Sequence, residues 1–314
     1  MNNKLIKGIS SCALAAMLLS TGAAAQTATQ DNAAVSTENI SFSGCVEKIR
    51  SVYTERYPEQ VDIVNGVIDD VTSDKTFLEY YEYEGKTAFR ILEDTLMDAL
   101  TPAIEPYNYD GQVAWTSYTV PVLTQMNDYY CGPAAVQMAL IGNGFWSNTS
   151  ENRENKKQQE IAKELSTSSS GGTYLFKITE YMQGFISSET ITYKSKLFTR
   201  NTYDTIFGLF STSLRSNKVI ILNIPDTSYL GYYNGKRYSD DGHYVIIKKF
   251  DETKRKLTVV DPFHLNKVDT ATNKYLNNEH EISLDDLISL AKDKNFWASV
   301  YTYTEDDSIK SYVF

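Results

Sequence analysis

The sequence predicts an α+β fold, in which helices pack on an antiparallel sheet that is formed mainly by the later part of the chain. Apolar residues at helical spacing predict helices at 132–143, 154–166, 174–185, 202–216 and 284–293. Runs rich in β-branched and aromatic residues predict strands at 191–198, 218–224, 243–250, 256–261 and 297–303. Together these elements form a domain at 115–314, which is long enough to bury a full hydrophobic core.

The first 25 residues have the pattern of a secretory signal peptide. Lys4 and Lys7 precede an apolar run from Ile9 to Leu19, and small residues follow, so the mature chain is expected to begin near Gln26. The run is too short to span a bilayer comfortably, and no later stretch approaches about 18 consecutive apolar residues. We therefore expect an exported protein, secreted or in the cell envelope, with no transmembrane segment in the mature chain.

The segment after the signal peptide is expected to contain a flexible lead-in and an acidic helical region. Residues 26–42 are rich in Ala, Thr, Ser, Gln and Asn, which suits a lead-in. Residues 43–114 show helical spacing before Pro58 and again before Pro102. Two or three helices of this size bury little alone, so the region is expected to dock on the next domain. An inhibitory prosegment, a folding chaperone, a partner-binding extension and a structural appendage all remain possible roles.

The charge of the chain and its motifs exclude several classes of function. Residues 26–110 carry 17 acidic and 6 basic side chains, and the whole chain has a net charge of −10. Such acidity argues against nucleic-acid binding, which needs clustered Lys and Arg. There is no His-x-x-x-His, no Cys-x-x-Cys and no Gly-rich phosphate loop before a helix, so no metal or cofactor is expected.

The most informative feature is a thiol at the start of a predicted helix. Cys131 comes directly before Gly132 and Pro133, and proline suits the first turn of a helix because its missing N–H has no partner there. Free backbone N–H groups and the helix dipole at such a position favour the reactive thiolate form of cysteine. A small buried cysteine that only packs is the alternative, and Cys131 alone does not distinguish the two.

A nucleophilic thiol needs a base, and the chain has only three histidines, His243, His264 and His280. His243 is the best candidate, because it follows a turn signal and begins an apolar run that predicts a buried strand. Residues 251–256 predict a hairpin loop, and antiparallel pairing of the next strand would return Asp261 to His243. A carboxylate at that place can orient the imidazole.

Gln125, six residues before Cys131, supplies the remaining part of the expected site. Its side-chain N–H and the backbone N–H of Cys131 could donate to an oxyanion that develops during acyl transfer. Each residue also has an ordinary structural explanation: a surface glutamine, a core histidine, or an Asp-Pro strand end at Asp261. Their occurrence together favours nucleophilic catalysis.

The motifs around these residues resemble a known family. They are Val120–Gln125 (VPVLTQ), Cys131–Ala135 (CGPAA), Gly171–Thr173 (GGT), Gly242–Val245 (GHYV) and Val260–Phe263 (VDPF). Across roughly 115–305 the sequence is similar to the bacteriocin-processing, double-glycine leader peptidase-like branch of the papain-like cysteine peptidases. The resemblance implies a papain-like fold, in which a helical lobe with the nucleophile helix packs on an antiparallel sheet and carries an N-terminal helical extension.

The resemblance also implies a role for each candidate residue. Gln125 would complete the oxyanion hole, Cys131 would be the nucleophile, His243 the general base and acid, and Asp261 the residue that orients His243. The implied activity is hydrolysis of peptide or protein amide bonds through an acyl-enzyme. An acyltransferase, a deamidase or a cell-wall peptide amidase on the same residues stays open, as does a non-catalytic binding module, because the fold does not fix the function.

Two cysteines follow the expected signal peptide, Cys45 and Cys131. A pair in an exported protein would ordinarily predict a disulfide. A bond between these two would consume the nucleophile, so both are expected to be reduced in the active form. A redox lock formed by this bond is the alternative.

Overall fold

The computed structural model describes residues 41–100, 113–116, 118–187, 191–200, 203–230, 242–263, 268–269, 274–275 and 279–303. These residues all belong to one compact unit. The expected signal peptide at 1–25, nearly all of the lead-in at 26–42, and His264 lie outside the described residues. The expected domain boundary at 114/115 stays a prediction, because residues 101–112 are also outside them.

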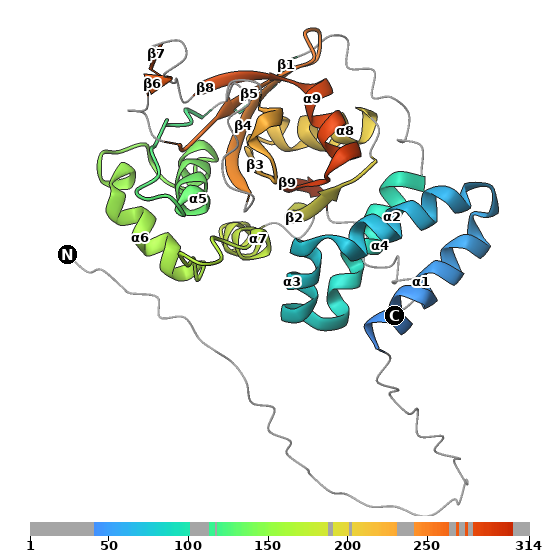
Figure 1. Ribbon diagram of the computed structural model, residues 1–314. Helices are drawn as coiled ribbons and strands as arrows, with labels where there is room; N and C mark the ends of the chain where they lie inside the picture. Colours follow the sequence, from blue (N-terminus) through green and yellow to red (C-terminus); the bar gives the residue numbers. More distant parts are fainter. Residues whose placement is uncertain are drawn as a thin grey trace, which may run out of the picture. The chain divides into compact units, whose positions relative to one another are not determined.

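The described residues contain the following helices and strands (Figure 1). The α-helices are α1 (Phe42–Arg56), α2 (Val61–Ser73), α3 (Lys75–Glu84), α4 (Phe89–Leu100), α5 (Cys131–Gly142), α6 (Asn155–Glu164), α7 (Leu175–Gln183), α8 (Tyr203–Arg215) and α9 (Leu284–Asp293). The strands are β1 (Val113–Trp115), β2 (Ile191–Phe198), β3 (Ile220–Ile224), β4 (His243–Asp251), β5 (Lys256–Val260), β6 (Val268–Asp269), β7 (Lys274–Tyr275), β8 (Glu279–Ser283) and β9 (Phe296–Tyr303).

An antiparallel sheet forms the centre of the fold, as the sequence predicts. Its strand order is β2-β9-β3-β4-β5-β8, β1 pairs with the far end of β4, and every pairing is antiparallel. The hairpin expected around 251–256 is confirmed, since β4 and β5 pair with Ile246 opposite Val260. This register brings the first residue of β4 close to the residues that follow β5.

Both faces of the sheet are buried, each under a different set of helices. Tyr244 and Ile246 of β4 belong to the core under α5, α6 and α7, whereas Val245 and Ile247 belong to the core under α8 (Figure 1). Successive side chains of a strand point to opposite faces, so a strand covered on both faces must be apolar throughout. Burial of β4 on both faces therefore explains the continuous apolar run after His243.

The predicted helices and strands of residues 131–303 are confirmed to within about two residues at each end. One difference concerns the site directly, because α5 begins at Cys131 itself and not at the residue after it. Strands β1, β6, β7 and β8 were not predicted. They are short, and an alternation of two to five residues is too brief to distinguish from a loop.

The described part of the acidic N-terminal region contains four α-helices, α1 to α4, where the sequence predicts two or three. The helices that were not identified individually are α2, which is rich in Val and Ile, and α3, which is rich in Tyr. These residue types favour strands in isolation. Burial of one face of each helix, through Val64, Val67, Ile68 and Val71 of α2 and Phe77 of α3, outweighs that preference.

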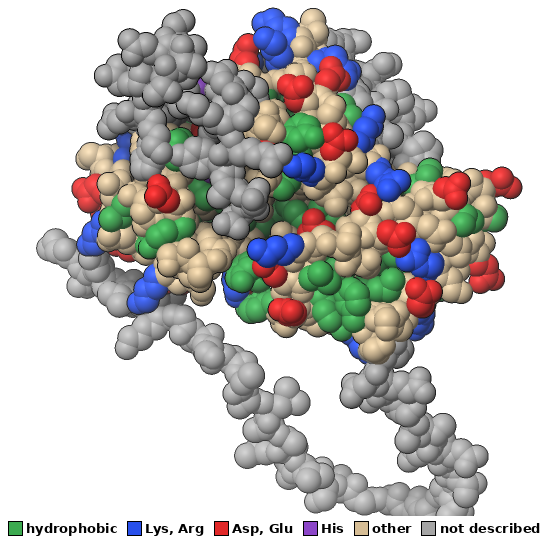
Figure 2. Space-filling model, in the orientation of Figure 1, with side chains coloured by type: hydrophobic (Ala, Val, Ile, Leu, Met, Phe, Trp, Pro, Cys, Tyr) green, Lys and Arg blue, Asp and Glu red, His purple; other side chains and the backbone are tan. Residues whose placement is uncertain are grey.

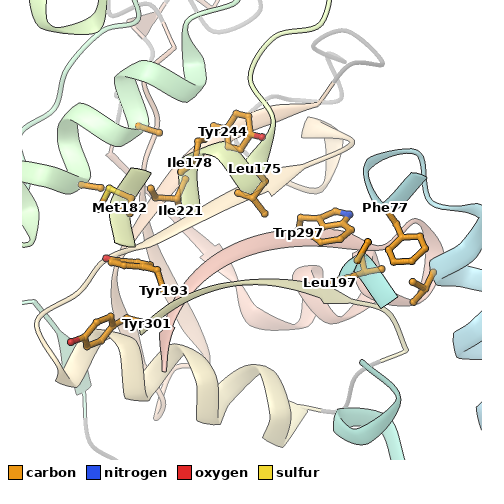
Figure 3. Packing of buried hydrophobic residues seen from close by; sticks show 14 of the residues in the cluster. Phe77, Leu175, Ile178, Met182, Tyr193, Leu197, Ile221, Tyr244, Trp297 and Tyr301 are labelled. Atoms are coloured by element: carbon orange, nitrogen blue, oxygen red, sulfur yellow. The ribbon is translucent and has the colours of Figure 1, made fainter. Parts of the chain in front are cut away.

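This region packs on the sheet, as its small size predicts. Phe77 of α3 lies beside Trp297 of β9 and Leu197 of β2 in the shared core (Figure 3). The indole Nε1 of Trp297 donates a hydrogen bond of 3.0 Å to Asp74, at the start of α3. The guanidinium Nε of Arg200, just after β2, pairs with Asp70 of α2 at 2.5 Å.

Cys45 lies in α1 and has no exposed surface. It forms no disulfide with Cys131. A bond between the two sulfurs would require Cys45 to leave the core in which it packs. The reduced state of both thiols in the active form stays a prediction.

A buried charge provides a test of how firmly the N-terminal region is attached. The ammonium of Lys196 on β2 is only 3% exposed and lies 3.1 Å from Asp98 and 3.8 Å from Asp94 of α4. Asp98→Ala removes the nearer carboxylate and leaves this ammonium in the interior, so the free energy of unfolding should fall by roughly 2–4 kcal/mol. Lys196→Met removes the charge and keeps the apolar stem, so it should cost much less.

Urea unfolding measures both variants, with the exposed Glu82→Ala on α3 as the control. If Asp98→Ala is as stable as this control, the ion pair does not hold α4 on the sheet.

Candidate functional site

The thiol of Cys131 lies at the tip of a buried helix. Every residue of α5 from 132 to 142 is buried, whereas Cys131 itself is partly exposed. A side chain at Gly132 would place its Cβ 2.6 Å from Oγ1 of Thr173, so only glycine allows this close approach. The surrounding core thus fixes the helix, and the helix holds the sulfur at its accessible N-terminal end.

The β4–β5 hairpin brings His243 and Asp261 together, as the sequence predicts. His243 is the first residue of β4, Asp261 comes directly after β5, and both side chains are buried. Nε2 of His243 lies 2.8 Å from Oδ1 of Asp261, and the same oxygen accepts a hydrogen bond from the backbone N–H of Phe263. A carboxylate can only accept, so Nε2 carries the proton and Nδ1 is the nitrogen that can face a thiol.

The imidazole of His243 also interacts with the thiol of Cys131, through a hydrogen bond and through charge. Burial lowers the pKa of His243, but the charge and hydrogen bond of Asp261, with those of Cys131, outweigh burial and raise this pKa to about 10. The imidazole is therefore a cation at neutral pH, between a carboxylate and a sulfur.

Gln125 is buried close to this group, but its side chain is engaged within its own loop. Its amide Nε2 donates a hydrogen bond of 2.7 Å to the carbonyl of Asn127, and among the described residues it makes no hydrogen bond to Cys131. Its backbone N–H donates to the carbonyl of Pro262, which ties the loop to the residue after Asp261. An amide has two N–H groups, so the contact with Asn127 uses one of them.

Gln158 of α6 holds the loop that carries Gln125, and the sequence reasoning did not find it. Its Oε1 accepts from the N–H of Met126 at 2.9 Å, and its Nε2 donates to the carbonyl of Thr124 at 2.9 Å. These two bonds clamp the loop on both sides of Gln125. The available signal was a glutamine on the apolar face of a predicted helix, one turn before Ile161, where burial requires a polar partner.

Thr173 and Tyr244 form a second support of the site. Both belong to the motifs that carry the family resemblance, but the sequence did not indicate what they do. The hydroxyl of Tyr244 donates a hydrogen bond of 2.7 Å to the carbonyl of Thr173, and the side chain of Thr173 packs on Gly132. The loop at 171–173 is therefore fastened both to the strand of His243 and to the helix of Cys131.

The other histidine in the described residues is His280. His280 lies on β8 opposite Val259, and burial lowers its pKa while Asp261 and Glu279 act in the opposite direction. Among the described residues, no cluster of three or more His, Cys, Asp and Glu side chains could hold a metal ion.

Cys131, His243 and Asp261 thus form one continuous chain of contacts between α5 and the β4–β5 hairpin. A thiolate beside an imidazolium can attack a carbonyl carbon, and the imidazolium can then protonate a leaving group. The first N–H groups of α5 have no partner within the helix and can donate to a developing negative charge.

The sequence model of the Peptidase_C39 like family matches residues 117–283, which is just over half of the chain. This range contains Gln125, Cys131, His243 and Asp261. No curated protein sequence matches the chain.

Two solved structures are similar to this one. A protein described as a C39-like peptidase from Bacillus anthracis is 11% identical, with a TM-score of 0.35, and the match covers 62% of this chain and 98% of that one. UfSP from C. elegans is 12% identical, with a TM-score of 0.38, and the match covers 65% of this chain and 37% of UfSP. Likenesses at this level carry no argument about chemistry.

The raised pKa of His243 predicts an unusual titration. The imidazolium should persist through neutral pH and be lost only as the pH rises through about 10, because Asp261 stabilises the charged form. Asp261→Asn removes that charge and leaves the opposing effect of burial, so the pKa of His243 should fall. NMR titration of the imidazole resonances measures both values.

Glu281→Gln, an exposed carboxylate change on β8, is the control for Asp261→Asn and should leave the titration unchanged. An ordinary titration near pH 6.5 in the wild type would contradict the ion pair.

Proposed function

Because this chain belongs to the Peptidase_C39 like family, we propose that it is a cysteine peptidase that hydrolyses peptide or protein amide bonds. The observation that carries the proposal is the contact of Cys131 with the imidazole of His243, which Asp261 holds from the other side. Nucleophilic catalysis by a thiol requires this set of nucleophile, base and orienting group.

In the first half of the reaction, the Cys131 thiolate attacks the carbonyl carbon of the amide. The carbonyl oxygen becomes an oxyanion, which accepts hydrogen bonds from the backbone N–H of Cys131 and from the second N–H of the Gln125 amide. The imidazolium of His243 then gives its proton to the amide nitrogen. The C–N bond breaks, the amine leaves, and a thioester remains on Cys131.

In the second half, the neutral imidazole of His243 takes a proton from water as the water oxygen attacks the thioester carbon. The C–S bond breaks, the carboxylic acid product leaves, and the thiolate–imidazolium pair forms again. Asp261 keeps its hydrogen bond to Nε2 of His243 throughout, so Nδ1 stays directed at the sulfur and the reacting atoms. Gln158 acts as a positioning residue, because it holds the loop of Gln125 without touching the substrate.

The proposal predicts that the peptidase activity depends on the thiol of Cys131 and not on that of Cys45. Incubation with a peptide library, followed by mass spectrometry, should show cleaved peptides for the wild type and none for Cys131→Ala, which removes the nucleophile. Cys45→Ala is the matched control and should keep turnover. Cleavage that survives Cys131→Ala means that another group is the nucleophile, and trapping the acyl adduct on Cys131 identifies the fragment that is transferred.

The role of Gln125 is tested in the same assay. Loss of one oxyanion donor lowers kcat by about 10²–10³ in comparable enzymes, so Gln125→Ala should do so with little change in KM. Gln159→Ala, an exposed glutamine on α6, should change neither constant. A Gln125→Ala enzyme with normal kcat would remove this residue from the oxyanion hole.

We also propose that the peptidase acts outside the cytoplasm. The support is the signal-peptide pattern of residues 1–25, which lie outside the described part of the chain. None of the helices that the structure describes has both the length and the apolar character to cross a membrane. Sequencing the N-terminus of the protein recovered from the medium or envelope should give a start near Gln26, and an intact Met1 would contradict export.

A further inference from the structure

The loop that contacts the catalytic helix leads directly to an exposed aromatic ring. Thr173 packs on Gly132 and accepts the hydrogen bond of Tyr244, so it lies next to Cys131. The following residue, Tyr174, is 37% exposed. A group bound near the sulfur could therefore extend along this loop.

The exposed ring belongs to a row of aromatic side chains that joins the loop to α3. The rings of Tyr174 and Phe176 are stacked, with centroids 5.3 Å apart, and those of Phe176 and Tyr83 lie 4.9 Å apart. Tyr83 on α3 is 53% exposed. The ammonium of Lys177 lies 3.9 Å from the centroid of the Tyr83 ring and helps to hold it. We call Tyr83, Tyr174 and Phe176 the aromatic surface.

Carboxylates border the aromatic surface. Glu79 lies one turn before Tyr83 on the same side of α3, because residues four apart are neighbours on a helix. The side chain of Glu79 is 30% exposed, and its carboxylate lies 3.8 Å from the ammonium of Lys75. Figure 2 shows hydrophobic side chains gathered over α3, with acidic side chains beside them.

We propose that α3 and the 173–177 segment form a binding subsite for the substrate peptide, which takes an aromatic or large aliphatic side chain on the aromatic surface and a basic residue beside Glu79. Exposed tyrosine rings bury large apolar area at little cost in side-chain freedom, which is why they are common where proteins bind peptides. The carboxylate of Glu79, which already attracts the exposed ammonium of Lys75, also complements a basic side chain of the substrate. The inference rests on the proposed peptidase activity.

This subsite gives the N-terminal region a role in substrate recognition. Its helices α2 and α4 are fastened to the sheet by Asp70 and Asp98, so α3 is held in a fixed place beside the loop. A prosegment would be removed to open the site, whereas a subsite must remain for the enzyme to bind its substrate.

The test compares a peptide with a small ester. The peptide is the best substrate found in the library, and the ester is p-nitrophenyl acetate, which is too short to reach from Cys131 to α3. Tyr83→Ala and Tyr174→Ala should each raise KM for the peptide by about tenfold, with little change in kcat, as is usual for an exposed aromatic contact. Tyr83→Phe keeps the ring and should restore the KM. The rate with the ester should be the same in all of these variants.

The role of the Glu79 charge is tested with a second peptide, in which neutral residues replace the basic residues of the first. Glu79→Gln should raise KM for the basic peptide and leave the neutral peptide unchanged. The matched controls are Leu78→Ala on α3 and Glu55→Gln on α1, both exposed changes outside the proposed subsite that should leave both peptides unaffected.

The outcomes separate this inference from the proposed function. Peptide cleavage with an unchanged KM in Tyr83→Ala and Tyr174→Ala overturns the subsite and leaves the peptidase in place. A wild type that cleaves no library peptide overturns both. A fall in the ester rate of Tyr174→Ala shows that the substitution disturbs Cys131 itself, and this also overturns a role in substrate binding alone.

Discussion

The buried contact between His243 and Asp261 is the constraint on which the rest of the site depends. Both side chains are almost fully enclosed, and burial alone would disfavour the charged form of either one. At 2.8 Å each group offsets the cost of burying the other, and the raised pKa of His243 follows from this. The imidazole is thereby held as a cation with one nitrogen committed to Asp261, so only the other nitrogen is left to serve Cys131.

This contact requires a rigid frame, and the sheet supplies it. The antiparallel register of β4 and β5 sets where His243 and Asp261 lie, and cores on both faces of the sheet prevent the register from slipping. The face that supports α5 also supports the helices of the N-terminal region (Figure 3). The packing that fixes Cys131 therefore continues into the packing that places α3 beside the loop at 173–177. The geometry of the candidate site and the proposed substrate recognition depend on one core.

Sequence patterns identified the elements with long, regular signals and missed those that depend on their neighbours. The helix of Cys131 and the hairpin of His243 and Asp261 could be predicted, because their apolar runs are long and bounded by turn residues. Helix α3 was missed as an individual element, since its tyrosines favour a strand until Phe77 is buried against Trp297. Gln158 was missed because its two hydrogen bonds to a loop distant in sequence produce no periodic pattern of residues.

The sequence by itself determined the α+β class, the place of the thiol at a helix start, and the pairing of His243 with Asp261, because local spacing and hairpin pairing specify these. Only the tertiary structure decided that Cys131 touches His243, that Gln125 bonds to Asn127, and that the acidic helices lie beside the site. Those facts depend on contacts between residues far apart in the chain, such as Asp98 with Lys196, and such contacts follow from packing, not from local propensity.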